Sequence, residues 1–292
     1  MSLRTRPLHP RFGVEVLDVD MRDVTADHLY AELRALFEEH SLLLFRGQSL
    51  DDSEHLRFGA LWGPVEDRSY GAMGAAPRMA NVSNRRDDGT VAGADDPLTL
   101  DLTGNQLWHT DSIFLPLPAL INVLAARVLS STGGETELVS TRAAFADMPP
   151  DLQQRLERTE FTHRLAHSRR AISAELYQRH RDRFPDQSWK AVWPNPVHGA
   201  PAVYLASHTF AVDGNESPEA QAFVDDLIAF CTEPHRVYTH SWRLGDVLVW
   251  DERATLHRGR PWPYDEERTL ASICVSVTAT DGLDAVRVAA RP

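Results

Sequence analysis

The segment spanning residues 105–111 contains a His-x-Asp pair, His109 and Asp111, which strongly constrains how the chain can fold. In an extended strand, residues i and i+2 point to the same face, so an imidazole and a carboxylate can approach one point. Both groups bind metal ions. Because two ligands do not complete a site, the fold must bring a further ligand to this segment from elsewhere in the chain.

His257 is the candidate for that third ligand, since it follows residues 245–251, an apolar stretch that reads as a strand entered by a turn. Two histidines and one carboxylate on one face, with open positions opposite, select non-haem Fe(II) for oxygen chemistry. Arg268 lies eleven residues after His257 and would offer a fixed cation to an anionic co-substrate. Asp251 is a rival carboxylate with poorer geometry, and Arg253 is a candidate for orienting a ligand.

The ordered set, from the His-x-Asp pair through His257 to Arg268, resembles the Fe(II)/2-oxoglutarate dioxygenases of the taurine dioxygenase family. Within that family, the chain most resembles the 2,4-dichlorophenoxyacetate dioxygenase branch. The resemblance extends over most of the chain and includes segments 7–10, 44–48, 58–59, 105–109, 133–137 and 250–251. A lone His-x-Asp occurs by chance in many chains, whereas the ordered set with matching flanks is strong evidence.

The resemblance implies a mainly β fold with helical insertions, a double-stranded β-helix (jelly-roll) of the cupin kind. Periodicity alone does not separate this fold from other α+β folds. We expect one domain over residues 1–292, because no repeat, low-complexity tract or linker is evident. Residues 66–105 are expected to form a lid or binding loop near the metal, and residues 161–190 an insertion that helps to cover the substrate.

The resemblance also implies Fe(II) as the cofactor, with 2-oxoglutarate and O2 as co-substrates. The metal ligands would be His109, Asp111 and His257. Thr136, which follows the glycine turn at residues 133–134, and Arg268 would hold the far carboxylate of 2-oxoglutarate. A strand threonine without a ligand is the alternative for Thr136.

The substrate is expected to be a small organic molecule. Relatives that act on sulfonates or aryloxyalkanoates typically carry a second arginine four residues after the first, where this chain has Ser272. We still favour a carboxylate such as an aryloxyalkanoate, hydroxylated beside the ether oxygen so that a phenol and an oxo acid result. A sulfonate or a neutral substrate is the alternative. The candidates for substrate contacts are Ser272, through its hydroxyl, and Asn84, Arg85, Arg86, Arg169, Arg170 and His208.

Two other classes of protein use similar ligands. A zinc hydrolase could use the same three ligands with an activated water, but it would need neither Arg268 nor Thr136. A cupin-like binding protein that has lost its metal is the second alternative, which the complete ligand set disfavours.

Net charge and composition restrict the classes of partner that the chain could bind. Thirty basic and 42 acidic residues give a net charge of −12, which argues against a nucleic acid or an anionic membrane as the main partner. No stretch approaches 18 apolar residues and no secretory signal is evident, so we expect a cytoplasmic protein. Cys231 and Cys274 are expected to be buried free thiols. A small-molecule substrate is the expected partner, and a homo-oligomer is left open.

Local patterns predict the elements around the site. Residues 41–45 are a continuous apolar run that predicts a central buried strand. Residues 26–40 have a helical period with Thr25 as the candidate cap, and a second helix opens at Ser49 or Asp51. His28, His40 and His55 belong to none of the ligand spacings, so they are expected at the solvent or at helix ends.

Overall fold

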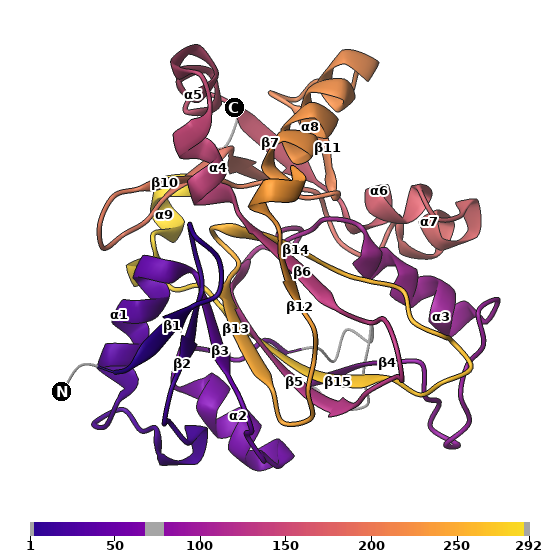
Figure 1. Cartoon of the computed structure of the whole chain (residues 1–292). Helices are drawn as coiled ribbons and strands as arrows, with labels where there is room; N and C mark the ends of the chain where they lie inside the picture. Colours follow the sequence, from indigo (N-terminus) through magenta and orange to yellow (C-terminus); the bar gives the residue numbers. More distant parts are fainter. Residues whose placement is uncertain (1–2, 68–78, 289–292) are drawn as a thin grey trace.

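The computed structural model describes residues 3–67 and 79–288 (Figure 1). Its largest sheet has seven strands in the order β1-β2-β3-β13-β5-β15-β4. Their bounds are Thr5–Pro7 (β1), Val14–Val16 (β2), Leu42–Phe45 (β3), Val247–Asp251 (β13), Ala119–Val128 (β5), Thr269–Ser276 (β15) and Ala80–Ser83 (β4). Strands from both ends of the chain therefore lie in one sheet.

A three-stranded sheet in the order β12-β6-β14 lies over the large sheet. Its strands are Tyr238–His240 (β12), Thr136–Ser140 (β6) and Thr255–Gly259 (β14). Leu138 of β6 belongs to the same buried apolar cluster as Leu124 of β5 and Leu270 of β15. This two-sheet sandwich with helical insertions confirms the predicted jelly-roll fold.

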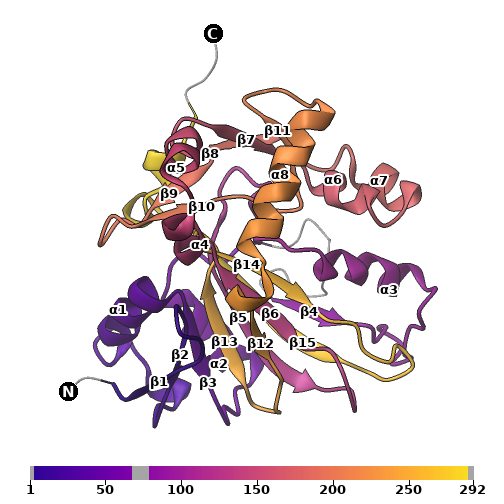
Figure 2. The same cartoon turned by 45° about the horizontal axis from the view of Figure 1, so that its top comes forward.

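The remaining strands and most helices gather at one end of the sandwich, as Figure 2 shows from a second direction. The strands are Glu160–His163 (β7), Gln187–Lys190 (β8), Val192–Pro194 (β9), Pro201–Val203 (β10) and Thr209–Val212 (β11). The helices are Thr141–Asp147 (α4), Pro150–Leu156 (α5), Leu165–Arg170 (α6), Ala174–His180 (α7), Pro218–Cys231 (α8) and Leu283–Val286 (α9). The insertion predicted at residues 161–190 thus contains α6 and α7.

The buried strand predicted at residues 41–45 is confirmed as β3, which is fully buried between β2 and β13. The second predicted helix is α2 (Asp52–Ala60), and Asp51 caps it. Asp51 Oδ1 accepts a 2.8 Å hydrogen bond from the Glu54 amide, and Glu54 Oε2 accepts one of 2.9 Å from the Asp51 amide. This reciprocal pair satisfies two amides at the start of the helix.

Two predictions about the N-terminal helices are wrong. The first helix, α1 (Tyr30–His40), begins after Leu29, so Thr25 does not cap it. The backbones of Thr25 and His28 instead bond each other at 3.0 and 3.1 Å in a tight turn. His55 is fully buried, not at the solvent, because its Nε2 lies 3.0 Å from the carbonyl oxygen of Val123 in β5.

The loop predicted at residues 66–105 is described only in part, because residues 68–78 lie outside the described residues. The rest contains β4 and α3 (Pro97–Leu102), and a 3-10 turn, η2 (Thr103–Gln106), then leads to the His-x-Asp segment. Cys231 and Cys274 are both buried and are not joined by a disulfide, as predicted. None of the helices in residues 3–67 and 79–288 has the length and apolar character needed to span a bilayer.

Candidate metal centre and co-substrate pocket

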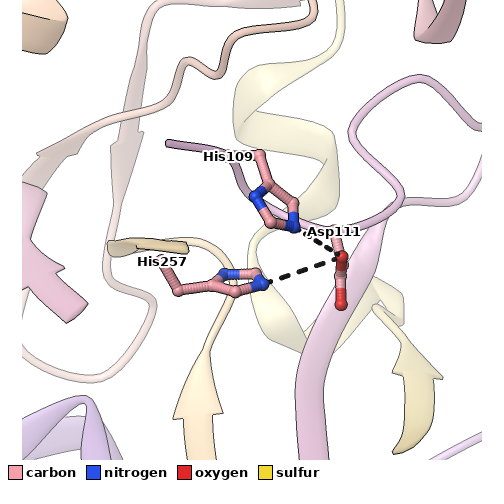
Figure 3. A group of neighbouring side chains, drawn as sticks. All are labelled: His109, Asp111 and His257. Atoms are coloured by element: carbon pink, nitrogen blue, oxygen red, sulfur yellow. Dashed lines mark ion pairs between the residues drawn. The ribbon is translucent and has the colours of Figure 1, made fainter. Parts of the chain in front are cut away.

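The three predicted metal ligands lie together between the two sheets (Figure 3). Asp111 Oδ1 is 3.6 Å from Nε2 of His109 and 3.8 Å from Nε2 of His257. One ligand atom from each residue lies within 4.8 Å of the other two, so the group could hold a metal ion. The donor set of two imidazoles and one carboxylate is the one expected for non-haem Fe(II).

The backbone brings His109 and His257 together from segments far apart in the sequence. The two residues form an isolated antiparallel bridge, with N···O distances of 3.0 and 2.8 Å in the two directions. The expected extended strand is limited to this bridge, because Asp111 lies in a turn and Ser112 has a φ of +57°. The approach of the two side chains therefore depends on the bridge to β14 as well as on the i, i+2 spacing.

A backbone carbonyl orients the ring of His109. Its Nδ1 lies 2.7 Å from the carbonyl oxygen of Leu107. A carbonyl only accepts hydrogen bonds, so Nδ1 carries the proton and the lone pair of Nε2 faces Asp111. Burial lowers the pKa of His109, although the Asp111 charge opposes this shift. The ring is thus held in the neutral form that binds metals.

The carboxylate of Asp111 is held by a polar chain that crosses the large sheet. Asn122 of β5 donates a 2.6 Å hydrogen bond to Asp111 Oδ2, and Ser272 of β15 donates one of 3.0 Å to Asn122 Oδ1. These bonds leave Oδ1 facing the histidines. Asn122 was not among the residues predicted from the sequence, although a single amide in the apolar run of residues 119–126 was a usable signal.

A buried glutamate lies behind the centre. Oε2 of Glu252 accepts a 2.9 Å hydrogen bond from the Asp111 amide and one of 3.0 Å from Thr110 Oγ1. The same oxygen is 3.8 Å from Nδ1 of His257, which has no hydrogen-bond partner among the described residues. Burial, and then the charge of His109, lower the pKa of His257 to about 3, so this imidazole is also neutral.

Asp251 is not close to the ligand set. It is fully buried and pairs with Arg253 at 2.8 Å and with Arg142 at 3.4 Å. Arg253 also pairs with Glu38 at 2.8 Å, so it joins β13 to α1. The expectation that Arg253 orients a metal ligand is wrong, because its hydrogen bonds go to these carboxylates and to a backbone carbonyl.

A cavity adjoins the three ligands, and all three line it. Its other lining residues come from both sheets and from the loops at their edge: Val82, Leu102, Asn105, Gln106, Asn122, Leu124, Thr136, Trp250, Gly259, Arg260, Trp262, Arg268, Leu270 and Ser272. The structure thus brings the predicted co-substrate residues Thr136 and Arg268 to the same cavity as the metal ligands. Its walls combine apolar side chains with polar and charged groups that can orient a small molecule.

Arg268 is a buried cation, and no carboxylate of the described residues lies within ion-pairing distance of it. Its Nη2 donates a 2.6 Å hydrogen bond to the carbonyl of Gly134, and the guanidinium stacks 4.9 Å from the Trp262 ring. Gly134 has a φ of +73°, and a Cβ there would lie 2.6 Å from Arg268 Nε. Burial lowers the pKa of Arg268 to about 10, so the group stays charged at neutral pH.

Thr136 begins β6 beside Arg268 in the cavity wall. Its Oγ1 accepts a 3.1 Å hydrogen bond from Nε1 of Trp242. The indole only donates, so the hydroxyl proton of Thr136 remains available to a ligand oxygen. The hydroxyl of Thr136 and the guanidinium of Arg268 can therefore both donate hydrogen bonds to one carboxylate.

Four of the residues predicted to contact substrate, Asn84, Arg85, Ser272 and His208, have different surroundings. Asn84 is fully buried, donates to backbone carbonyls of residues 264 and 266 and accepts from the Arg268 amide, so these backbone groups hold its side chain in place. Arg85 is exposed and pairs with Glu267. Neither residue lines the cavity beside the metal ligands.

Ser272 and His208 lie close to the ligand set. Ser272 lines the cavity, but its hydroxyl is bonded to Asn122. The ring of His208 lies edge-on to that of His109, with 6.1 Å between ring centroids, and it also meets the edge of Phe114 at 5.2 Å. His208 therefore faces the metal ligands from outside the co-substrate cavity.

The chain is similar to known proteins over almost its whole length. Residues 4–274 match the family described as "Taurine catabolism dioxygenase TauD, TfdA family". The chain is 33% identical to the alpha-ketoglutarate-dependent 2,4-dichlorophenoxyacetate dioxygenase of Cupriavidus pinatubonensis, over 92% of this chain and 96% of the relative. It is 31% identical to the (S)-phenoxypropionate/alpha-ketoglutarate-dioxygenase of Sphingobium herbicidovorans, over 90% and 91%.

The fold gives the same result. The crystal structure of AAD-2 in complex with Mn(II) and N-oxalylglycine is similar to this structure, with a TM-score of 0.87 and 30% sequence identity over 95% of this chain and 99% of AAD-2. These findings favour an oxygenase over a zinc hydrolase or a metal-free binding protein. The chain belongs to the TauD, TfdA family and is a 2-oxoglutarate-dependent dioxygenase, an enzyme class that uses Fe(II) and O2.

Proposed function

We propose that this dioxygenase hydroxylates a small carboxylate of the aryloxyalkanoate type, with Fe(II) held by His109, Asp111 and His257. The arrangement of Nε2, Nε2 and Oδ1 around one point carries the assignment of the metal site. Both imidazoles are buried with a lowered pKa, so no proton competes with a metal at neutral pH.

The co-substrate 2-oxoglutarate would bind beside the metal, with its far carboxylate on Arg268 and Thr136. Support comes from the chemistry of the cavity, because Arg268 is a buried cation without a carboxylate partner among the described residues. Planar guanidinium groups bind carboxylates through two parallel hydrogen bonds. The stack on Trp262 and the bond to Gly134 hold the guanidinium in place before the co-substrate arrives.

Iron supplies the activation of O2 in this chemistry. In the overall reaction, 2-oxoglutarate loses CO2 and becomes succinate with one oxygen atom of O2, while the other oxygen atom enters a substrate C–H bond as a hydroxyl. On the carbon beside an aryl ether oxygen, that hydroxyl makes a hemiacetal. Its C–O bond to the aryl oxygen then breaks, the hydroxyl proton goes to the aryl oxygen, and a phenol and an oxo acid are released.

An aryl group fits the surroundings of His109. The rings of His208 and Phe114 meet edge-on, and Phe184 lies 5.4 Å from Phe114, so an aromatic wall begins at the metal ligand. Edge-to-face and offset contacts of this kind favour a flat aromatic ligand. The similar dioxygenases named for 2,4-dichlorophenoxyacetate and for (S)-phenoxypropionate act on such compounds, as their names say.

A substrate panel tests the proposal. Aryloxyacetates, aryloxypropionates, alkyl sulfates, sulfonates and neutral aryl ethers are each incubated with Fe(II), 2-oxoglutarate and O2, and succinate and phenol are measured. We expect coupled release of both products from aryloxyalkanoates alone. More distant relatives include an alkylsulfatase of Acinetobacter baylyi at 24% identity, so turnover confined to sulfur esters would replace the carboxylate assignment. Turnover confined to neutral ethers would overturn it as well.

Several expectations stay predictions. They are a single domain over residues 1–292, a lid formed by part of residues 66–105, a cytoplasmic location, a homo-oligomeric state, and the lack of nucleic-acid or membrane partners. The mixture of N-terminal and C-terminal strands in the large sheet supports the single domain.

A further inference from the structure

We propose that Arg169 is the cation that binds the substrate carboxylate. The inference rests on the proposed function. Relatives that act on aryloxyalkanoates typically carry an arginine where this chain has Ser272, so another residue must supply the positive charge for the substrate carboxylate. Ser272 cannot supply that charge, and its hydroxyl is already bonded to Asn122. Arg268, the buried cation of the co-substrate cavity, is assigned to 2-oxoglutarate.

Arg169 lies near the end of α6, in the part of the insertion that packs beside α3. It is only 7% exposed. The guanidinium packs against the backbone of η2, since a Cβ on Gly104 would lie 2.5 Å from its Cζ. The side chain is therefore held between α6 and the segment that leads into the metal ligands.

The donors of this buried guanidinium are under-used. Nη1 donates a 3.1 Å hydrogen bond to Ser168 Oγ, whereas Nε has no hydrogen-bond partner among the described residues. That Nε faces the ion-pair partner Asp101, but its distance to Asp101 Oδ1 is 3.5 Å, and the same oxygen lies 3.3 Å from Nε2 of His180. Buried charges normally have close partners with good geometry, so the remaining donors fit an incoming anion.

Arg169 is connected to the metal centre through Ser168 and His208. Ser168 Oγ lies 2.9 Å from Nδ1 of His208, and the His208 ring lies edge-on to the ring of His109. Contacts through Ser168 and His208 thus link Arg169 to the proposed iron ligand His109.

The other candidate arginines are less suited. Arg85 and Arg86 are more exposed and already paired, with Glu267 and Asp96 respectively. Arg170, next to Arg169, is exposed. A salt bridge in water contributes little, whereas one formed in a buried site is screened much less.

The test measures binding without turnover. Protein loaded with Mn(II) and N-oxalylglycine, the pair found in AAD-2, is titrated by calorimetry with phenoxyacetate and with phenoxyacetamide, which has the same shape but no charge. Wild type should prefer phenoxyacetate. Arg169→Gln should weaken phenoxyacetate binding by about 10- to 100-fold, as for loss of a charge-assisted hydrogen bond, with little effect on phenoxyacetamide.

Asp101→Asn is the matched control, because it removes the ion-pair partner and leaves the guanidinium. If Arg169 only docks α6 on α3, Asp101→Asn and Arg169→Gln should weaken phenoxyacetate binding alike, because each breaks the same ion pair. We expect instead that Asp101→Asn binds phenoxyacetate as tightly as wild type or more tightly, since a competing carboxylate is gone. Arg169→Lys keeps the charge and should retain more of the preference than Arg169→Gln, which also covers the case in which the Gln variant fails to fold.

The outcomes separate the two proposals. A wild type that binds neither Mn(II) nor N-oxalylglycine contradicts the proposed function. A wild type that binds both, but prefers the amide or shows no preference, overturns the role of Arg169 alone. Equal preference for phenoxyacetate in wild type, Arg169→Gln and Arg169→Lys overturns it too.

Discussion

The side-chain amide of Asn122 donates a 2.6 Å hydrogen bond to Oδ2 of Asp111 and so sets which carboxylate oxygen faces the histidines. Partners of this kind behind a metal ligand typically contribute 10- to 100-fold to metal affinity. We expect Asn122→Ala to weaken Mn(II) binding by about that factor, measured by calorimetry. Asn81→Ala, at an exposed position of β4, is the control and should bind Mn(II) as wild type does.

The buried cation Arg268 leads to a second prediction. Arg268→Ala should weaken the binding of N-oxalylglycine, and raise the Michaelis constant for the co-substrate, by about 10- to 150-fold, which corresponds to the loss of a charge-assisted pair of about 1.5–3 kcal/mol. Calorimetry and initial rates of succinate release measure the two effects. Arg85→Ala removes an exposed arginine from the neighbouring loop and should leave both constants unchanged. An Arg268→Ala variant with normal co-substrate affinity would show that another residue anchors 2-oxoglutarate.

The two candidate carboxylates can be separated by thermal unfolding. A metal at 100 times its dissociation constant stabilises a protein by about 2.7 kcal/mol, so Mn(II) should raise the Tm of wild type. Asp111→Ala should lose this increment and fold normally. Asp251→Asn should lower the Tm of the metal-free protein, because it breaks the buried pair with Arg253, but should keep the increment. The reverse pattern would make Asp251 the ligand.

The buried ring of His55 predicts a pH dependence of stability. Burial lowers its pKa in the folded protein to about 4, so between pH 6.5 and pH 4 the unfolded chain binds a proton that the folded chain does not. This contribution to stability is complete above pH 6.5 and is lost as the pH falls towards 4, by roughly 3 kcal/mol.

His55→Gln should therefore reduce the dependence of the unfolding free energy on pH, measured with urea on metal-free protein at pH 7 and pH 5. Glutamine keeps an N–H that can bond the Val123 carbonyl but does not titrate. His28→Gln, at an exposed position, should show the wild-type dependence. A His55→Gln variant with an unchanged slope would assign the acid sensitivity to other buried groups, such as His163.

Local sequence determined the elements whose signals lie within a few residues. The apolar run became β3, and the reciprocal cap of Asp51 and Glu54 began α2 where expected. The same local reasoning failed for α1, because the turn between Thr25 and His28 satisfies the backbone that a cap would have served. It also failed for His55, whose burial results from the packing of α2 against the large sheet.

The candidate ligands His109, Asp111 and His257 followed from residue type, spacing and family resemblance, because chemistry restricts which side chains bind iron. Which groups hold them was decided by the tertiary structure alone. The site also receives three residues from distant segments: Asn122 from β5, Glu252 from the β13–β14 turn and Ser272 from β15. The sequence does not indicate that these segments meet. Asn84 resembled a binding residue in sequence, yet the fold satisfies its amide with backbone partners, because a buried polar group must be hydrogen-bonded wherever the chain places it.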